Sequence, residues 1–311
     1  MTRTWNIVTM AAALAVAPVL APAFAHASER GGESAAAHTP ARLAKACAGR
    51  DGWLDAAPPA RIFANTWYVG TCGISAILVT GKEGHVLVDA GMTGAAPAVL
   101  ANIRRAGFEP RDIRWIVASH EHHDHVGALA ALQRATGAKV AAVASQKAAL
   151  ESGKPSAGDP QASGLDLIAP VRVERVLAEG DTVKVGNLVL TAHVTPVHAP
   201  GSTSWTWRSC TDKGACHAVA YADSSSTISS GAYRFSDHPE RIAGVRQGIA
   251  AMSALPCEIL LTPHPAASAM MERSAGTRPL ADAQACRAYA AGAKSRFAAR
   301  LAEEQARETS R

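Results

Sequence analysis

Residues 119–127 read Ser119-His120-Glu121-His122-His123-Asp124-His125-Val126-Gly127 and directly follow the hydrophobic segment Trp115-Ile116-Val117-Ala118. Four of the chain's 12 histidines fall within six residues of this stretch. If the hydrophobic segment is a buried strand, side chains two positions apart in the extended turn after it, such as His120 and His122, share one face. Asp124 and His125 then stand where a helix begins. Neutral imidazole and carboxylate are metal ligands, so the stretch predicts two neighbouring metal ions.

Two further histidines occupy similar places along the chain. His198 follows a predicted strand over 187–195, and His264 follows the strand-like segment Glu258-Ile259-Leu260-Leu261. Each alone would more often be an ordinary surface or core histidine. Their shared placement at strand ends favours metal ligation.

The order of the predicted elements indicates a layered α/β domain made of two similar halves, each with strands and a helix pair. Period-two hydrophobic runs and glycine punctuation predict the strands, and helical spacing predicts the helices. Residues 28–60 show no clear period and are interpreted as an irregular arm. The stretch 152–170 is interpreted as a surface loop, either a mobile lid or a fixed wall. The predicted strands are 62–69, 75–80, 85–89, 115–118, 139–143, 172–177, 187–195, 203–208, 217–222 and 258–261, and the predicted helices are 95–106, the segment from 124 through 135, 239–253 and 280–306.

The composition supports a large folded domain. Of the 311 residues 48% are hydrophobic, which argues against a disordered chain or a small disulfide scaffold. The 31 Lys and Arg against 26 Asp and Glu give a formal charge of only +5, with no basic run. We therefore expect no nucleic-acid partner.

Residues 1–27 are typical of a signal peptide. Arg3 gives a cationic start, the segment 7–20 is nearly continuous in apolar residues, and Ala25-His26-Ala27 offers a small-x-small cleavage site. The apolar segment is too short to span a membrane comfortably. We predict export to the periplasm, cleavage, and a mature domain 28–311 that is not attached to the membrane.

The six cysteines fit an exported protein. An even number in an oxidising compartment predicts disulfides, and six cysteines allow 15 connectivities. No C-x-x-C pair is present, which disfavours a cysteine zinc site. Cys210 and Cys216 flank a short polar turn and form the most plausible local bridge. The other four are Cys47, Cys72, Cys257 and Cys286.

Taken together, these motifs resemble the metallo-β-lactamase superfamily. The pattern H-x-H-x-D-H after a strand, with later single histidines after two more strands, is the superfamily's. The surroundings of these motifs are similar to the third subclass of the class B zinc β-lactamases, whose zinc ligands include no cysteine. The supporting segments are Thr71-Cys72-Gly73-Ile74-Ser75, Val88-Asp89-Ala90-Gly91, His198-Ala199-Pro200-Gly201-Ser202-Thr203-Ser204-Trp205-Thr206-Trp207, Tyr221-Ala222-Asp223-Ser224 and Thr262-Pro263-His264-Pro265.

The resemblance implies a four-layer αββα sandwich with the metal site at one edge of its two sheets. It implies two Zn²⁺ ions per chain and hydrolysis of penicillins, cephalosporins and carbapenems by a zinc-bridging hydroxide that Asp124 orients. Such an enzyme confers antibiotic resistance, and we expect a monomer. The implied ligands are His120, His122 and His198 for the first zinc and Asp124, His125 and His264 for the second, and the implied disulfides are Cys47–Cys72, Cys210–Cys216 and Cys257–Cys286.

Several roles stay open at this point. Ser224 and Ser226 are candidates for binding the substrate carboxylate. In other superfamily branches an Asp after this strand bridges the metals. If Asp223 has that role, the chain would be a different metallo-hydrolase of the same fold, acting on a lactone, thioester or phosphodiester. His123 is interpreted as a neighbour of the ligands or a pocket residue. A non-catalytic exported zinc-binding protein is the third hypothesis.

Overall fold

A computed structural model of the chain describes residues 1, 2, 4, 5 and 38–309. Contacts divide the chain into Met1–Gly31 and Gly32–Arg311, and the second unit contains all the helices and strands described below. Residue 3 and residues 6–27 of the signal peptide predicted over 1–27 lie outside the described residues, and the signal peptide stays a prediction. Within the described ranges, every helix is too short or too polar to cross a membrane.

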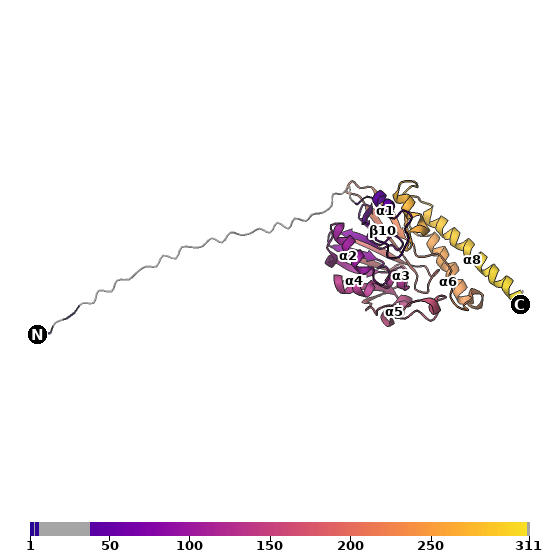
Figure 1. The fold of residues 1–311 in the computed structure, drawn as a ribbon, viewed down its shortest axis with the longest axis horizontal. Helices are drawn as coiled ribbons and strands as arrows, with labels where there is room; N and C mark the ends of the chain where they lie inside the picture. Colours follow the sequence, from indigo (N-terminus) through magenta and orange to yellow (C-terminus); the bar gives the residue numbers. More distant parts are fainter. Residues whose placement is uncertain (3, 6–37, 310–311) are drawn as a thin grey trace. The chain divides into compact units, whose positions relative to one another are not determined.

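Two β-sheets form the centre of the fold (Figure 1). The first sheet has seven strands in chain order, antiparallel from β1 to β4 and parallel from β4 to β7. The second has five strands in the order β12-β11-β10-β9-β8, antiparallel except for the parallel pair β11 and β12. The strands are β1 Ala60–Phe63, β2 Thr66–Tyr68, β3 Ile77–Gly81, β4 Gly84–Val88, β5 Ile113–Val117, β6 Lys139–Val143, β7 Arg175–Leu177, β8 Thr182–Val185, β9 Leu188–Val194, β10 Thr203–Cys210, β11 Cys216–Tyr221 and β12 Ile259–Leu261.

Alternation along the strands explains the layers. In β4, Val86 and Val88 enter the core between the sheets, whereas Leu87 enters a second core on the outer face. In β11, Tyr221 joins the core between the sheets, and Ala220 faces the opposite way. Because successive side chains of a strand point to opposite faces, each sheet has an apolar layer on both sides and needs helices to cover its outer face.

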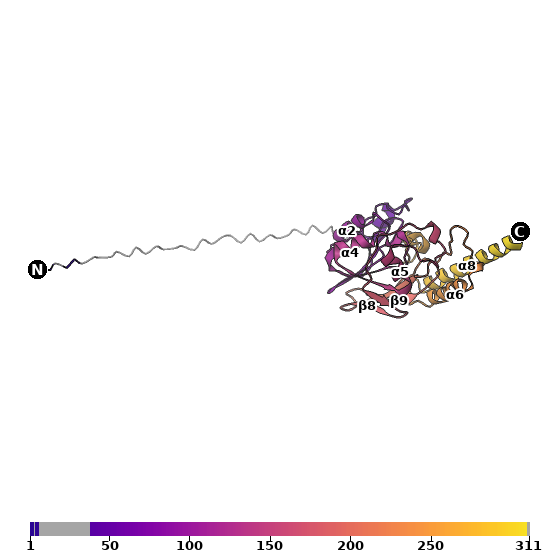
Figure 2. The same cartoon turned by 90° about the horizontal axis from the view of Figure 1, so that it is seen from below.

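Helices cover both outer faces. α2 and α4 supply Ile103 and Leu132 to the outer core of the first sheet. On the second sheet, α6 and α8 pack against each other and lie side by side in both views (Figure 1, Figure 2). The predicted four-layer αββα sandwich is therefore confirmed. The helices and 3₁₀ turns are α1 Pro40–Ala46, α2 Ala96–Arg105, η2 Pro110–Asp112, α3 His123–Val126, α4 Leu129–Thr136, α5 Ala144–Ser152, η3 Ala162–Gly164, η4 Phe235–Asp237, α6 Pro239–Ser253, η5 Pro265–Ser268, α7 Met270–Ser274 and α8 Ala285–Thr309.

The N-terminal arm and the last helix differ from the predictions. The arm predicted to be irregular over 28–60 contains helix α1, which was missed. Thr39 Oγ1 accepts a hydrogen bond from the backbone N–H of Arg42, and Pro40 stands in the first turn, so the helix has a local start signal. The helix predicted over 280–306 begins only at Ala285.

Three disulfides fasten the peripheral segments. They are Cys47–Cys72, Cys210–Cys216 and Cys257–Cys286, the pairs that the resemblance implies. The first ties the end of α1 to the loop before β3, the second closes the turn between β10 and β11, and the third ties the start of α8 to the segment before β12. Each bridge stabilises the fold by limiting the freedom of the unfolded chain.

Candidate metal centre

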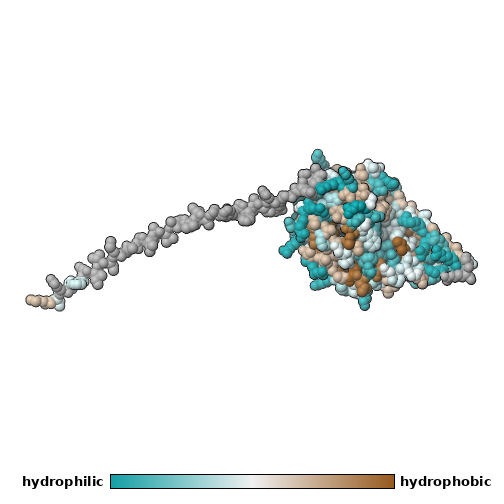
Figure 3. Space-filling view, in the orientation of Figure 1, coloured by the Kyte–Doolittle hydropathy of each residue, from teal (hydrophilic) through white to brown (hydrophobic). Residues whose placement is uncertain are grey.

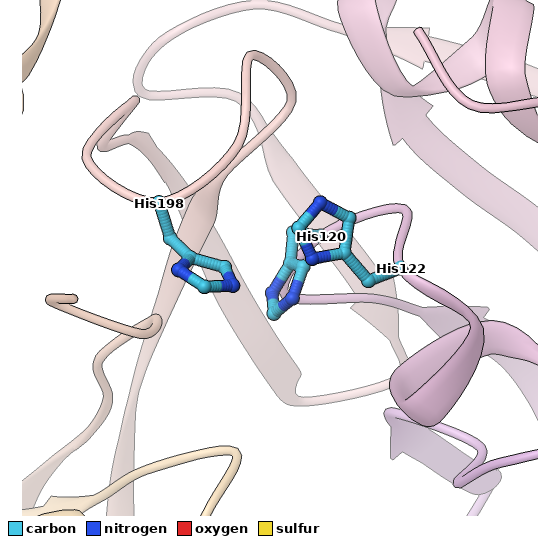
Figure 4. A group of neighbouring side chains, drawn as sticks. All are labelled: His120, His122 and His198. Atoms are coloured by element: carbon cyan, nitrogen blue, oxygen red, sulfur yellow. The ribbon is translucent and has the colours of Figure 1, made fainter. Parts of the chain in front are cut away.

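Three histidines from two loops converge at one edge of the sheets. His120 and His122 follow β5, and His198 follows β9; all three are buried. Their ring centroids are 4.6 to 4.9 Å apart, and one ligand atom from each lies within 4.8 Å of the others. Figure 4 shows the three rings gathered around one common space. We call His120, His122 and His198 the histidine group.

Each ring of the histidine group has at least one nitrogen in contact with a residue outside the group. A neutral imidazole has one donor and one acceptor nitrogen, so fixing one nitrogen decides what the other can do. The buried Nε2 of His120 has no hydrogen-bond partner among the described residues. A buried polar atom without a partner is unusual, and a role as a metal ligand would account for it. The outer contacts are His120 Nδ1 to Asp223 Oδ1 at 2.8 Å, His122 Nε2 to Asp159 Oδ2 at 2.7 Å, and His198 Nδ1 to Ser226 O at 2.8 Å.

The electrostatics favour the neutral form of His120 and of His198. Burial, reinforced by the neighbouring histidines, holds the pKa of His120 well below its ordinary value. Burial and the adjacent His122 lower the pKa of His198 to about 3. Metal ligation requires the neutral imidazole, so at neutral pH neither ring must lose a proton to bind a cation.

A second set of ligand types lies beside the first. Asp124 and His125 belong to α3, and His264 follows β12. Asp124 Oδ2 lies 3.0 Å from His125 Nε2 and 3.3 Å from His264 Nε2, and the two imidazole nitrogens are 3.3 Å apart. His120, Asp124 and His125 also place ligand atoms within 4.8 Å of one another, so the two sets adjoin at His120. We call Asp124, His125 and His264 the aspartate group.

Charge dominates the aspartate group. Burial alone would lower the pKa of His125, but Asp124 and Asp89 raise it to about 10. Burial would likewise raise the pKa of Asp124, but His125 and His264 hold it well below its usual range. The two carboxylates thus stabilise a positive charge on His125, and a metal cation at this place would bring a charge of the same sign.

Asp89 connects the metal-binding loop to both sheets. It follows β4 with φ of +64°, an uncommon backbone conformation for a residue other than glycine. Its Oδ1 accepts from the backbone N–H of Ser119 at 2.7 Å, and its Oδ2 accepts from Ser119 Oγ at 2.8 Å and from the Tyr221 hydroxyl at 2.6 Å. Asp89 Oδ2 also lies 3.4 Å from His125 Nδ1. One carboxylate therefore fixes the strand end from which the histidines project.

Asp223 and Ser224 occupy different places. Asp223 is fully buried, contacts His120 Nδ1, and is a member of neither set of converging ligand atoms. Burial raises its pKa well above the ordinary value. Ser224, Ser226 and His264 lie near one cavity of about 570 Å³, whose far wall includes Arg296 of α8. The geometry thus makes Asp223 a support of His120.

Two carboxylates and an indole near the site were given no role from the sequence: Asp159, Glu121 and Trp53. Asp159 comes from the loop after α5. Glu121 Oε1 accepts from the backbone N–H of Gly201 at 3.2 Å, and burial raises the Glu121 pKa to about 7. The ring of Trp53 lies 5.9 Å from that of His123 and 6.0 Å from that of His264. Asp159 and Trp53 belong to no spacing motif, so the chain pattern gives no signal for them. Glu121 fills a variable position of the H-x-H-x-D-H motif, and the motif assigns no role to that position.

Some exposed apolar side chains belong to loops that supply residues to the site. Trp53, Leu54, Leu167 and Ile228 are large hydrophobic residues that remain exposed, and they belong to the loops that contact the site or to their immediate continuations. Figure 3 shows that hydrophobic residues form only small separate spots on the visible face of the domain. His123, next to Trp53, is largely buried and lies 3.9 Å from Asp166. It belongs to neither ligand group and stands at the rim.

Comparison with known proteins agrees with this geometry. The family model of the metallo-beta-lactamase superfamily matches residues 69–212. Curated relatives include hydroxyacylglutathione hydrolases of Methylobacterium nodulans, 35% identical over 111 residues, and of Anaeromyxobacter dehalogenans, 35% identical over 131 residues. These matches cover 35% and 42% of this chain and 34% and 40% of the relatives, so the chain spans well under half the length of either curated relative.

Solved structures match over nearly the whole fold. The metallo-β-lactamase MIM-1 from Novosphingobium pentaromativorans is 57% identical with a TM-score of 0.85, and the match covers 86% of this chain and 99% of that one. MEM-A1, a subclass B3 metallo-β-lactamase from a soil metagenome library, is 40% identical with a TM-score of 0.78, covering 82% of this chain and 100% of that one. The matches cover almost the whole of these two structures at 40% identity or more. The chain therefore belongs to the metallo-β-lactamase superfamily and groups with its subclass B3 members.

Proposed function

We propose that this chain is a zinc-dependent β-lactamase that hydrolyses the amide bond of penicillins, cephalosporins and carbapenems and thereby confers antibiotic resistance. The observation that carries the proposal is the buried histidine group with converging ligand atoms beside the aspartate group, in a chain 57% identical to a metallo-β-lactamase over nearly all of that protein.

The ligand assignment follows from the two groups. His120, His122 and His198 would hold one Zn²⁺, and Asp124, His125 and His264 would hold the other. Imidazole and carboxylate suit zinc, and the partnerless Nε2 of His120 fits a ligand role. When bound, two such ions supply an activated water at neutral pH and polarise the lactam carbonyl.

The chain's own residues orient the reactants. Asp124 is fixed by its contacts to His125 and His264, so its carboxylate can accept a hydrogen bond from the attacking water and aim it at the carbonyl carbon. Asp223 and Asp89 hold His120 and the strand end beneath it. The site therefore needs no serine or cysteine nucleophile.

The neighbouring cavity fits the substrate carboxylate. Ser224 and Ser226 supply hydroxyl donors on the side of His264, and the guanidinium of Arg296 donates to Ser225 Oγ at 2.8 Å on the far wall. A carboxylate in this cavity would meet a positive field together with hydroxyl groups. The apolar side chains at the rim, Trp53 above all, would contact the substituent on the other side of the lactam ring.

Export to the periplasm and a monomeric state complete the proposal. The three disulfides support an oxidising compartment, and the pattern over 1–27 supports a cleaved signal peptide. The mass of the secreted chain tests cleavage, which is expected before Ser28.

The decisive experiment is hydrolysis of a carbapenem by the purified mature chain, followed by ultraviolet absorbance, with zinc content measured in parallel. We expect turnover that a chelator abolishes and zinc restores, with two zinc ions per chain. His217→Ala, remote from the site, serves as the matched control. Two bound zinc ions without turnover of any β-lactam would refute the proposal.

One alternative substrate has a specific observation in its favour. The curated relatives are named hydroxyacylglutathione hydrolases, so thioester hydrolysis is the second candidate function. A hydroxyacylglutathione thioester should be assayed beside the carbapenem. The contact of Asp223 with the His120 ring favours the β-lactamase, because the thioester alternative would gain further support from an Asp223 that bridges the metals.

A further inference from the structure

The loop between α5 and β7, residues 153–174, inserts one buried carboxylate beneath the metal site. Asp159 is only 3% exposed, although Ala157 and Gly158 just before it are exposed. Its Oδ2 lies 2.7 Å from Nε2 of His122, and its Oδ1 accepts from the backbone N–H of Gln161 at 2.7 Å. Both carboxylate oxygens are therefore engaged, which fixes the plane of the carboxylate as well as its position.

The same loop is fastened at several other points. Ser156 Oγ donates to Glu121 Oε1 at 3.2 Å, and the Gln161 side-chain amide lies 3.3 Å from His198 Nε2. The carbonyl of Pro160 accepts from the backbone N–H of Ser230 at 3.0 Å. The loop thus contacts the segments on both sides of the histidine group, as a fixed wall of the site would.

We propose that Asp159 is a positioning residue that sets the tautomer and orientation of His122 for the metal and, through the same bond, couples the order of the 153–174 loop to the metal site. A carboxylate accepts the Nε2–H of His122, which leaves the Nδ1 lone pair free for a cation. His120 and His198 have the opposite arrangement, since it is their Nδ1 atoms that contact an outside carboxylate or carbonyl oxygen at 2.8 Å. Carboxylate partners of this kind orient ligand histidines and increase their basicity.

Asp166 provides a matched control on the same loop. Its side chain is 85% exposed. Its Oδ2 lies 3.9 Å from Nε2 of His123, a histidine that belongs to neither ligand group. Asp166→Asn therefore removes the same charge from the same loop without touching a ligand. Asp159→Asn keeps an acceptor oxygen but loses the charge, and Asp159→Ala removes both.

The test rests on the proposed zinc site but not on the identity of the substrate. Zn²⁺ is titrated into the metal-free mature chain against a competing chelator, and cleavage of the 153–174 loop by a protease is followed in the zinc-loaded protein. We expect Asp159→Ala to weaken binding of one zinc by about 10- to 100-fold. Asp159→Asn should lie between Asp159→Ala and the wild type, and Asp166→Asn should bind as the wild type does. The loop of Asp159→Ala should be cut faster than that of Asp166→Asn.

The outcomes separate this inference from the proposed function. Wild-type zinc affinity in Asp159→Ala would overturn it, and so would equal losses in Asp159→Asn and Asp166→Asn. If Asp159→Ala fails to fold, the comparison of the two asparagine variants decides by the same criterion. If the wild type binds two zinc ions but hydrolyses no β-lactam, the proposed β-lactamase function is refuted. The role of Asp159 in zinc binding can still be measured in that case.

Discussion

The histidine group and the aspartate group are built in opposite ways. In the histidine group, each ring is held from outside, by Asp223, by Asp159 or by the carbonyl of Ser226. In the aspartate group, the short contacts among ligand atoms run between the members themselves, from Asp124 to both imidazoles. The first set is therefore organised by its surroundings, and the second is held together mainly by contacts among its own members, with one outer contact from Asp89 to His125.

This difference predicts two kinds of metal site. External hydrogen bonds keep the histidine group in place whether or not a cation is present, so binding costs little rearrangement. In the aspartate group, a proton on His125 balances the charge of Asp124, and a cation must displace that proton to bind. The histidine group should depend mainly on its outer partners, whereas the aspartate group should depend on pH and on each of its members.

The largest effect is expected from removing a member of the aspartate group. His264→Ala should weaken one zinc site about a hundredfold and leave the other nearly unchanged. It removes one of three side-chain ligands, and with water as the fourth ligand each carries roughly a quarter of a binding energy of about 10–16 kcal/mol. Zinc titration with two resolved affinities measures this, and His217→Ala is the control. Equal weakening of both sites would show that the division of ligands is wrong.

Removing an outer partner should have a smaller effect. Asp223→Asn takes the carboxylate away from His120 Nδ1, and we expect a 10- to 100-fold loss in the affinity of the histidine group or in turnover. Asp212→Asn, in the exposed turn between β10 and β11, controls for the charge. Unchanged zinc binding and turnover in Asp223→Asn would mean that the His120 ring needs no outer support.

The pH dependence should distinguish the groups directly. In the metal-free chain the raised pKa of His125, about 10, means that its proton is present at neutral pH and must leave when a cation binds. Affinity at the aspartate group should therefore rise about tenfold per pH unit between pH 6 and 9. His120 and His198, with lowered pKa values, are already neutral there and contribute no such slope. Zinc titrations at pH 6, 7 and 8 measure how the affinity of each group changes with pH. The same change with pH at both groups would contradict the difference proposed between them.

The sequence was informative where ligands follow strands. The strand that ends at Val117 and the spacing from His120 to His125 are local, and period-two alternation places them at a sheet edge. The two-sheet architecture came from the same alternation together with the family resemblance. His198 and His264 were recognisable because each also follows a strand.

The supporting residues were not predictable because they depend on long-range packing. Asp159 and Trp53 come from segments without a hydrophobic period, and nothing in their neighbourhood distinguishes them from other loop residues. Short elements were missed for a related reason. β8 has four residues and α7 has five, lengths at which tertiary contacts outweigh local preference.

The smallest expected effect concerns the cavity beside the aspartate group. Arg296→Met removes its arginine charge, and we expect KM for a carbapenem to rise by a few-fold, because one exposed charge contact contributes about 0.2–1 kcal/mol. The kcat should stay nearly constant, since Arg296 is proposed to hold the carboxylate equally in the bound substrate and in the transition state. Lys294→Met, on the same helix but lining the groove between α6 and α8, is the matched control. A fall in kcat with KM unchanged would mean that Arg296 supports the 223–226 turn through its hydrogen bond to Ser225. Binding of the substrate carboxylate would then be assigned to Ser224 and Ser226 alone.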